Sequence, residues 1–293
     1  MTEITPHNVF TPAKEITDLD RFAGRSREMK EISNALQSEG AQLVIYGQRG
    51  IGKSSLARFL INLSQSKSES INRLAEKPFK NFDYLPIYLA CDDSITSIEK
   101  LLLRLLTDEN ALAPHLPFKV VDLKTTVEGG GKINIKILEV SGKGSQTTTE
   151  QAQTLEADLF ATFTNACKSL VKSSVVKHGL LLIVDEFDRI KDRTGIASLM
   201  KTLGPEGVTF ALVGVATNIQ DLIKDHVSVA RQLSEGVIHA EPMSDNDQIE
   251  IITRAMSALD VASRTIIWSL VKQVRVGLVP IFHGLHRRTA LER

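Results

Sequence analysis

Two kinds of apolar pattern alternate along the chain. Short runs of mostly apolar residues predict buried strands at residues 43–46, 84–91, 179–184, 208–218 and 236–243. Between them, apolar residues recur at every third or fourth position, which predicts amphipathic helices at residues 26–36, 53–64, 98–107, about 150–171 and 195–203. Because strands and helices take turns, the pattern favours an α/β fold built on a parallel sheet.

Residues 118–150 interrupt this alternation. Two strand-like runs flank Gly129, Gly130 and Gly131, which indicates a β-hairpin with a long glycine turn. We interpret the segment as an insertion, which is either a surface for a partner or ligand or a simple decoration. The pattern therefore predicts an irregular arm at residues 1–20, an α/β domain at 21–242 and a small helical domain at 243–293, with helices near 244–256, 263–276 and 281–291.

The strand at residues 43–46 runs directly into a glycine-rich turn. The turn fits the pattern G-x-x-x-x-G-K-[ST] at Gly47, Gly52, Lys53 and Ser54. Glycines let several backbone N–H groups point inward at a phosphate, and the helix that follows adds the positive end of its dipole. Lys53 can reach the β- and γ-phosphates, and the Ser54 hydroxyl can ligate Mg²⁺. The strand–loop–helix context favours this phosphate-binding loop over an ordinary glycine turn.

A second informative stretch is the apolar run at residues 179–184, which ends in Asp185 and Glu186. Asp185 is placed to hold the magnesium shell, and Glu186 to polarise a water for attack on the γ-phosphate. Many strands end in acidic residues, so the pair alone is a weak signal for a catalytic site. It becomes a strong signal because it follows the phosphate loop by about 130 residues.

Two further polar residues have open roles. Asn218 closes the strand at residues 208–218, where it can orient the attacking water or merely cap the short helix at 219–223, and Thr217 competes for the first role. Arg231 is either a charge-stabilising finger that reaches a γ-phosphate across a subunit interface or a solvated side chain.

Composition and charge narrow the choice of partners. Lys plus Arg and Asp plus Glu both number 35, so no global field favours nucleic acid or an anionic membrane. The apolar runs are far shorter than a membrane span. Cys91 and Cys167 each lie in an apolar stretch outside any metal-like cluster, which is typical of reduced, buried thiols. We therefore expect a cytoplasmic protein without a membrane partner.

One more motif stands at each end of the predicted α/β domain. Phe22-Ala23-Gly24-Arg25 with the following Glu28 opens it, and Pro242-Met243-Ser244-Asp245 leads into the helical segment after it. With the phosphate loop, the Asp185-Glu186 pair, Asn218 and Arg231, they make the chain resemble the AAA+ ATPases, most closely the Orc1/Cdc6-like and STAND-related branch. The resemblance runs from about residue 20 to the end of the chain.

This resemblance implies a P-loop NTPase three-layer sandwich whose parallel sheet has the order 5-1-4-3-2, with a small C-terminal helical lid beside the nucleotide. The lid need not be complete at Arg293. ATP and Mg²⁺ are the implied cofactors, with Ser54 and Asp185 as metal ligands and Glu186, Lys53, Asn218 and Arg231 as catalytic residues. The resemblance also implies that Gly24 and Arg25 line the adenine side of the nucleotide. The full implied nucleotide-binding set is Gly24, Arg25, Gly47, Gln48, Arg49, Gly50, Ile51, Gly52, Lys53, Ser54 and Ser55.

Three functions remain open at this stage. The first is an ATPase that hydrolyses ATP to ADP and phosphate while it assembles with itself and remodels or loads a macromolecular partner. The second is a nucleotide-dependent switch or scaffold with little turnover. The third, a small-molecule kinase, is disfavoured by Glu186 beside Asp185 and by the helical lid. A homo-oligomer or a partner protein is expected, and no winged helix follows the lid, so nucleic acid is weakly supported.

Overall fold

A computed structural model describes residues 22–65, 79–124, 134–139, 154–173, 177–223 and 226–258. The expected N-terminal arm at 1–20 and the helices expected at 263–276 and 281–291 lie outside these residues. The fold described below is therefore that of the predicted α/β domain together with the first helix after it.

The centre of the fold is a five-stranded sheet whose paired strands are all parallel. Its strands are β1 (Leu43–Gly47), β2 (Tyr84–Ala90), β6 (Gly179–Asp185), β7 (Val208–Val215) and β8 (Val237–His239). They lie side by side in the order β2-β6-β7-β1-β8. Numbered along the chain within this sheet alone, and listed from β8, that order is 5-1-4-3-2, so the predicted topology is confirmed.

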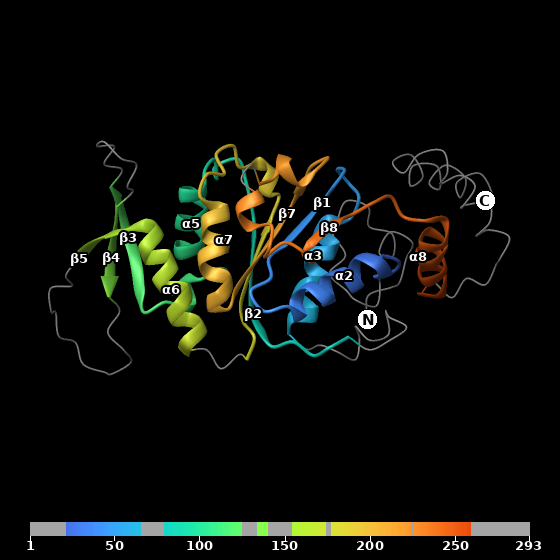
Figure 1. The fold of residues 1–293 in the computed structure, drawn as a ribbon, viewed down its shortest axis with the longest axis horizontal. Coiled ribbons are helices and arrows are strands. Elements are labelled where there is room, and N and C mark those ends of the chain that lie inside the picture. Colours follow the sequence, from blue (N-terminus) through green and yellow to red (C-terminus); the bar gives the residue numbers. More distant parts are fainter. Residues whose placement is uncertain are drawn as a thin grey trace, which may run out of the picture.

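Two groups of helices cover the two faces of this sheet (Figure 1). The first group is α2 (Ser26–Gln37) and α3 (Lys53–Ser64), and the second is α5 (Ile98–Thr107), α6 (Leu159–Ser173) and α7 (Ile196–Leu203). Alternate residues of each strand face opposite groups: Leu181 and Ile183 of β6 pack with α2 and α3, whereas Leu182 and Val184 pack with the other group. The three-layer α/β sandwich predicted from the sequence is confirmed.

The expected insertion at 118–150 contributes two strands to a second, antiparallel sheet of order β3-β4-β5, whose third strand, β5, lies beyond residue 150. The predicted hairpin corresponds to β3 (Phe118–Lys124) and β4 (Asn134–Glu139), which pair from Phe118↔Glu139 to Lys124↔Asn134. The helix predicted from about residue 150 is wrong over its first part, because Thr154–Asp158 is strand β5 and α6 begins only at Leu159. Leu155 and Ala157 alternate with polar residues, and this two-residue period is typical of a strand. The segment pairs with β4.

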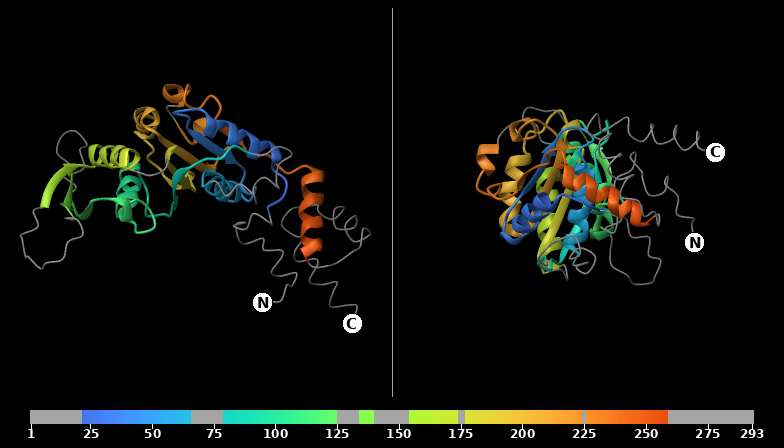
Figure 2. Two further views of the ribbon diagram at one scale, coloured as in Figure 1. Left: turned by 90° about the horizontal axis from the view of Figure 1, so that it is seen from below. Right: turned by 90° about the vertical axis from the view of Figure 1, so that its right-hand side faces the viewer.

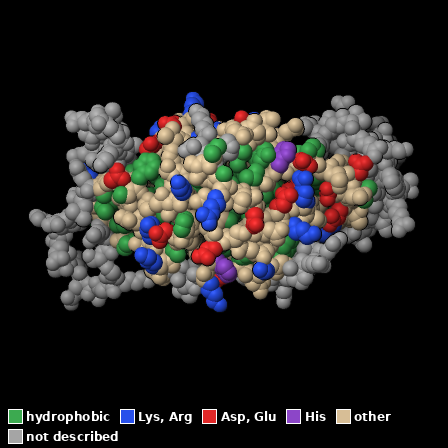
Figure 3. Space-filling model, in the orientation of Figure 1, with side chains coloured by type: hydrophobic (Ala, Val, Ile, Leu, Met, Phe, Trp, Pro, Cys, Tyr) green, Lys and Arg blue, Asp and Glu red, His purple; other side chains and the backbone are tan. Residues whose placement is uncertain are grey.

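The β3–β5 sheet and α8 (Asp245–Ala258) lie at opposite ends of the molecule (Figures 1 and 2). Of the expected lid at 243–293, the structure describes residues 243–258, which are α8 and the two residues before it. On the face drawn in Figure 3, acidic and basic side chains are intermixed rather than gathered by sign. Among the described residues, no helix is long and apolar enough to cross a membrane.

Candidate nucleotide-binding site

The loop between β1 and α3 has the backbone conformation that its glycines suggest. Gly50 (φ 78°) and Gly52 (φ 98°) are left-handed, and a Cβ added to either would meet no atom within 4 Å. Gly47 (φ 154°) differs, because a Cβ there would lie only 2.4 Å from the Ala240 carbonyl oxygen. Gly50 and Gly52 therefore shape an open cradle, whereas Gly47 allows close contact with the segment after β8.

Lys53 stands at the start of α3 and folds back over this loop. Its Nζ donates hydrogen bonds to the carbonyl oxygens of Gln48 (2.7 Å) and Gly47 (3.1 Å), and only 8% of the residue is exposed. Burial lowers the pKa of the Lys53 ammonium, and the nearby Asp188 and Asp185 carboxylates oppose that shift. The ammonium is therefore a positive charge held at the loop with few solvent contacts.

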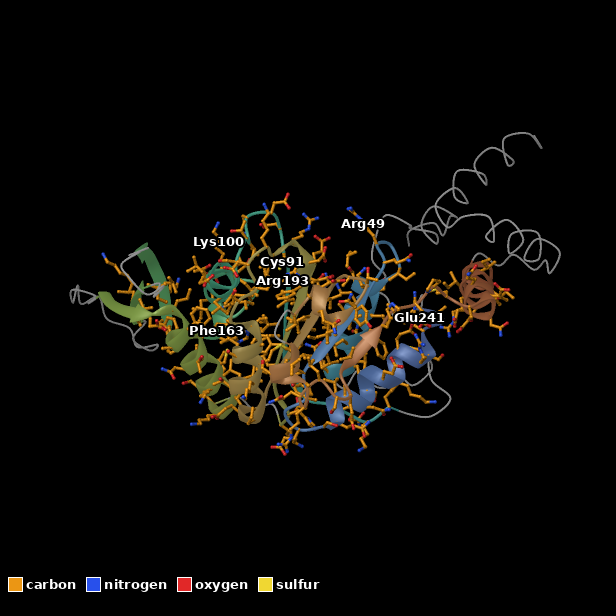
Figure 4. All side chains as sticks on the ribbon, turned by 45° about the horizontal axis from the view of Figure 1, so that its top comes forward. Arg49, Cys91, Lys100, Phe163, Arg193 and Glu241 are labelled. Atoms are coloured by element: carbon orange, nitrogen blue, oxygen red, sulfur yellow. The ribbon has the colours of Figure 1, made fainter. Side chains whose placement is uncertain are left out.

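The other loop residues are more accessible. Gln48, Arg49 and Gly50 are exposed, and Figure 4 shows Arg49 projecting from the outer end of the loop. Ser54 and Ser55 lie half-buried in the first turn of α3, and Ile51 is also half-buried. The loop thus presents its outer part to solvent while Lys53 and the glycine backbone form its floor.

Asp185 is the last residue of β6 and is 3% exposed. Its Oδ2 accepts a hydrogen bond from the Tyr88 hydroxyl (3.0 Å) and its Oδ1 from the Glu186 backbone N–H (2.8 Å). In a parallel sheet, the carboxyl ends of β1 and β6 meet at one edge, with β7 between them. The structure therefore brings Asp185 and Lys53 to the same edge of the sheet.

Glu186 directly follows and has a left-handed backbone (φ 53°). Its exposed carboxylate forms an ion pair with Arg189, which lies in the short helix η3 (Phe187–Arg189) and also donates to Asp93 Oδ1 at 2.9 Å. The carboxylate therefore stands at the sheet edge beside Asp185, but in this structure it is engaged by Arg189.

Asn218 is the N-cap of the short helix η5 (Ile219–Asp221). Its side chain accepts from the Asp221 backbone N–H (3.1 Å), while the Asp221 carboxylate accepts from the N–H groups of Asn218 and Thr217. The capping alternative for Asn218 is confirmed by this reciprocal pair. The role of Asn218 as a γ-phosphate sensor stays a prediction.

Arg231 follows the short helix η6 (His226–Val229) and is exposed. Its side chain makes no hydrogen bond or ion pair to any other residue in the part of the chain that the structure describes. The structure does not join it to the loop, so its role as a finger stays a prediction that depends on a second subunit.

The turn at Gly24 and Arg25 contacts the loop on one side and, on the other, α8 and the segment that leads into it. The buried Arg25 guanidinium donates to Glu28 (2.7 Å) and to the carbonyl oxygens of Ile51 and Glu241 (both 2.5 Å). The Gly24 N–H donates to Glu250 of α8 (3.1 Å). Figure 4 shows Glu241 beside α2. The turn is thus next to the loop, whereas its predicted adenine contacts stay untested.

Two residues near the site carry contacts that the sequence did not indicate. Tyr88 in β2 binds the Asp185 carboxylate, although inside an apolar run it looks like an ordinary core aromatic. Arg193 donates to the backbone oxygens of Asp188 and Asp221 and lies 5.6 Å from the centre of the Phe187 ring, so it joins η3 to η5. Asp185 lies 97 residues from Tyr88 and Asp221 lies 28 residues from Arg193, so neither of these two contacts has a local signal in the sequence.

The residues at this edge fit ATP with Mg²⁺. Gly50 and Gly52 are open, Lys53 holds a positive charge at the loop, and Asp185 and Ser54 carry side-chain oxygens of the kind that Mg²⁺ takes as ligands. Mg²⁺ bound together with a nucleotide takes only one or two protein carboxylates, since phosphates and waters complete its shell. Among the described residues, no group of three or more His, Cys, Asp and Glu side chains could hold a metal by itself.

A parallel sheet of order 5-1-4-3-2 with a phosphate-binding loop after its first strand defines a P-loop NTPase. A comparison with protein families matches residues 21–212 to the AAA ATPase domain. The chain therefore belongs to the AAA ATPase domain family, and the resemblance to AAA+ ATPases is confirmed at the level of the family.

Several solved structures are similar to this chain. The ORC2 protein of Aeropyrum pernix is 15% identical over 81% of this chain and 54% of its own (TM-score 0.45). CDC6P of Pyrobaculum aerophilum is 12% identical over 90% and 57% (TM-score 0.49), and DnaA of Aquifex aeolicus, bound to AMPPCP, is 16% identical over 94% and 69% (TM-score 0.46). The chain thus spans about half the length of the ORC2 protein. A search among curated proteins finds no match.

Proposed function

We propose that this chain binds ATP with Mg²⁺ in the loop at residues 47–55 and hydrolyses it to ADP and phosphate. The observation that carries the proposal is the position of Lys53, whose ammonium is held over the glycine loop at the same sheet edge as Asp185. A buried cation, an open backbone cradle and a carboxylate that can hold a metal are the parts that a nucleoside triphosphate requires.

In the bound state the Lys53 ammonium exchanges its hydrogen bonds to the Gly47 and Gln48 carbonyls for β- and γ-phosphate oxygens. The inward N–H groups of the loop and the N-terminus of α3 add partial positive charge to the same phosphates. Ser54 and Asp185 hold Mg²⁺, which neutralises charge on the phosphates when it is bound. Gly24 and Arg25 form the adenine side.

The hydrolytic step uses Glu186 as the general base. Its carboxylate takes a proton from a water molecule while the water oxygen attacks the γ-phosphorus, and ADP leaves with the electron pair of the broken P–O bond. To do so, Glu186 must leave Arg189, and an exposed ion pair of this kind is weak enough to open readily. Asn218 senses the γ-phosphate and Arg231 from a neighbouring subunit stabilises the developing charge.

We propose further that hydrolysis is coupled to self-assembly and to remodelling or loading of a macromolecular partner. Residues 21–242 then form the ATPase domain and residues 243–293 the lid. A second candidate is a switch or scaffold with little turnover, and the ion pair between Glu186 and Arg189 favours it, because the carboxylate is turned toward Arg189 rather than toward an attacking water while that pair is closed. A small-molecule kinase is less favoured, and nucleic acid remains a weakly supported partner.

The test compares Lys53→Ala and Glu186→Gln in equilibrium binding of a fluorescent ATP analogue and in steady-state phosphate release. Lys53→Ala should lose nucleotide binding, because the only loop ammonium is gone. Glu186→Gln keeps the size and shape of the side chain but removes its negative charge, so it should bind nucleotide normally yet release phosphate slower by orders of magnitude. Wild-type nucleotide affinity in Lys53→Ala would refute the proposal that the loop binds phosphate. Undiminished hydrolysis in Glu186→Gln would show that Glu186 is not the general base.

A further inference from the structure

Asp185 is held by a side chain from the neighbouring strand. Strands β2 and β6 pair in parallel, with Ala90 opposite Asp185 and Tyr88 opposite Ile183. Because alternate residues share a face, Asp185 continues the row of Leu181 and Ile183, which pack with α2 and α3. Tyr88 packs on that same face, and its hydroxyl reaches the Asp185 Oδ2 at 3.0 Å.

The Tyr88 ring is held in turn by α3, the helix that begins in the phosphate loop. The Arg58 guanidinium lies 3.9 Å from the centre of the Tyr88 ring, a cation–π contact. Arg58 comes four residues after Ser54 in α3, so the two side chains lie one helical turn apart on the same side of the helix. Tyr88 therefore connects Asp185 to the helix that carries Ser54, the other expected metal ligand.

We propose that Tyr88 is the positioning residue of this site: its hydroxyl fixes the Asp185 carboxylate for the metal ion, and Arg58 fixes the Tyr88 ring. The inference rests on the proposed function, since it concerns the magnesium that accompanies ATP. The carboxylate has one hydrogen bond on each oxygen, from Tyr88 on Oδ2 and from the Glu186 N–H on Oδ1. Each oxygen keeps a second lone pair, so the carboxylate is oriented and still able to ligate.

Tyr88→Phe removes the hydroxyl and keeps the ring against Arg58. The Asp185 carboxylate then loses one of its two orienting hydrogen bonds, and loss of such a second-layer partner typically weakens metal affinity by about 10–100-fold. We expect a weakening of this size for the metal–nucleotide complex. Nucleotide affinity measured in excess EDTA should not change, and phosphate release should recover when Mg²⁺ is raised to saturation.

Tyr84→Phe is the matched control. Tyr84 lies on the same strand and faces the same side of the sheet, but its hydroxyl donates to the Leu36 carbonyl oxygen (3.2 Å) rather than to Asp185. The substitution thus removes a hydroxyl hydrogen bond from the same strand without touching the carboxylate. Metal affinity should stay at the wild-type value in this variant.

The chain of residues 1–293 is titrated with Mn²⁺, as a stand-in for Mg²⁺, in the presence of a slightly substoichiometric non-hydrolysable ATP analogue. Free Mn²⁺ is followed by electron paramagnetic resonance. A weaker Mn²⁺ affinity in Tyr88→Phe but not in Tyr84→Phe supports the proposal. Unchanged Mn²⁺ affinity in Tyr88→Phe overturns it, even where the melting temperature falls, because the role is then only structural.

The wild-type protein separates this inference from the proposed function. If wild type binds Mn²⁺ no more tightly than the nucleotide alone does, the proposed magnesium site itself is wrong and the inference falls with it. If Tyr88→Phe does not fold, Arg58→Gln replaces it, because it removes the cation and leaves the hydroxyl. The cation–π contact that Arg58→Gln removes contributes about 0.5–1 kcal/mol, which corresponds to an Mn²⁺ affinity about 2–5-fold weaker. An unchanged Mn²⁺ affinity in Arg58→Gln counts against the proposal.

Discussion

The two kinds of glycine in the phosphate loop should respond differently to the same substitution. In Gly47→Ala the new methyl group would lie 2.4 Å from the Ala240 carbonyl oxygen, whereas ordinary contacts begin at 3.4 Å. The end of β1 must therefore move by about 1 Å from the segment after β8, although the Ala240 N–H is hydrogen-bonded to the Tyr46 oxygen at 2.8 Å. In Gly50→Ala the methyl group enters open space.

The expected losses follow from these contacts. Crowding in a packed interior costs about 1–3 kcal/mol, and a side chain at a φ of 154° adds backbone strain of about 1–3 kcal/mol. Gly47→Ala should therefore lower the free energy of unfolding by about 2–6 kcal/mol. Gly50→Ala meets only the cost of a left-handed residue, about 1–2 kcal/mol.

The measurement is urea unfolding of wild type and both variants without nucleotide, followed by circular dichroism. Gly47→Ala should be the less stable variant, with an unchanged dependence of the free energy on urea concentration. Gly50→Ala serves as the matched control, since it has the same chemical change in the same loop. A loss below about 1 kcal/mol in Gly47→Ala, or a larger loss in Gly50→Ala than in Gly47→Ala, would show that the described contact between the loop and Ala240 is wrong.

Three further predictions concern the reactivity of the thiols, the pH dependence of stability and the subunit interface. Burial raises the pKa of Cys91 to about 12 and also raises the pKa of Cys167. Neither thiol should therefore react with a disulfide reagent at pH 8 until urea unfolds the chain. Rapid reaction of the folded protein would contradict their burial. The same shift stabilises the protonated form in the folded state, so the free energy of unfolding should fall as the pH rises above about 9, the unshifted value. If Arg231 acts on a neighbouring subunit, mixtures of Arg231→Ala and Glu186→Gln should recover part of the phosphate release that each variant lacks; no recovery at any ratio counts against a shared site.

The sequence was sufficient for the parts of the fold that depend on local pattern. Buried parallel strands are continuous apolar runs, so β6 and β7 stood out, and the glycine spacing of the loop is itself the chemical signal. Strand β5 was missed because Leu155 fits the apolar face of a helix as well as the alternation of a strand. Only pairing with β4, which the sequence does not show, decides between them.

Contacts between distant segments were the part of the site that the sequence left undetermined. Tyr88 and Asp185 are 97 residues apart, and the three partners of Arg25 include backbone oxygens of Ile51 and Glu241. Every residue has a backbone carbonyl, so no motif could indicate the bonds of Arg25 to Ile51 and Glu241. Asn218 shows the opposite case, because the local sequence already offered a helix cap as one of its roles and the structure shows that cap, while its role toward the γ-phosphate stays a prediction.

The most direct test of the account is phosphate release from ATP with Mg²⁺, measured over a wide range of protein concentrations and compared with Lys53→Ala purified in the same way. We expect wild type to release phosphate well above the Lys53→Ala blank, with a specific activity that rises with concentration as a neighbouring subunit completes the site. Equal rates for wild type and Lys53→Ala at every concentration would contradict the proposal that this loop hydrolyses ATP.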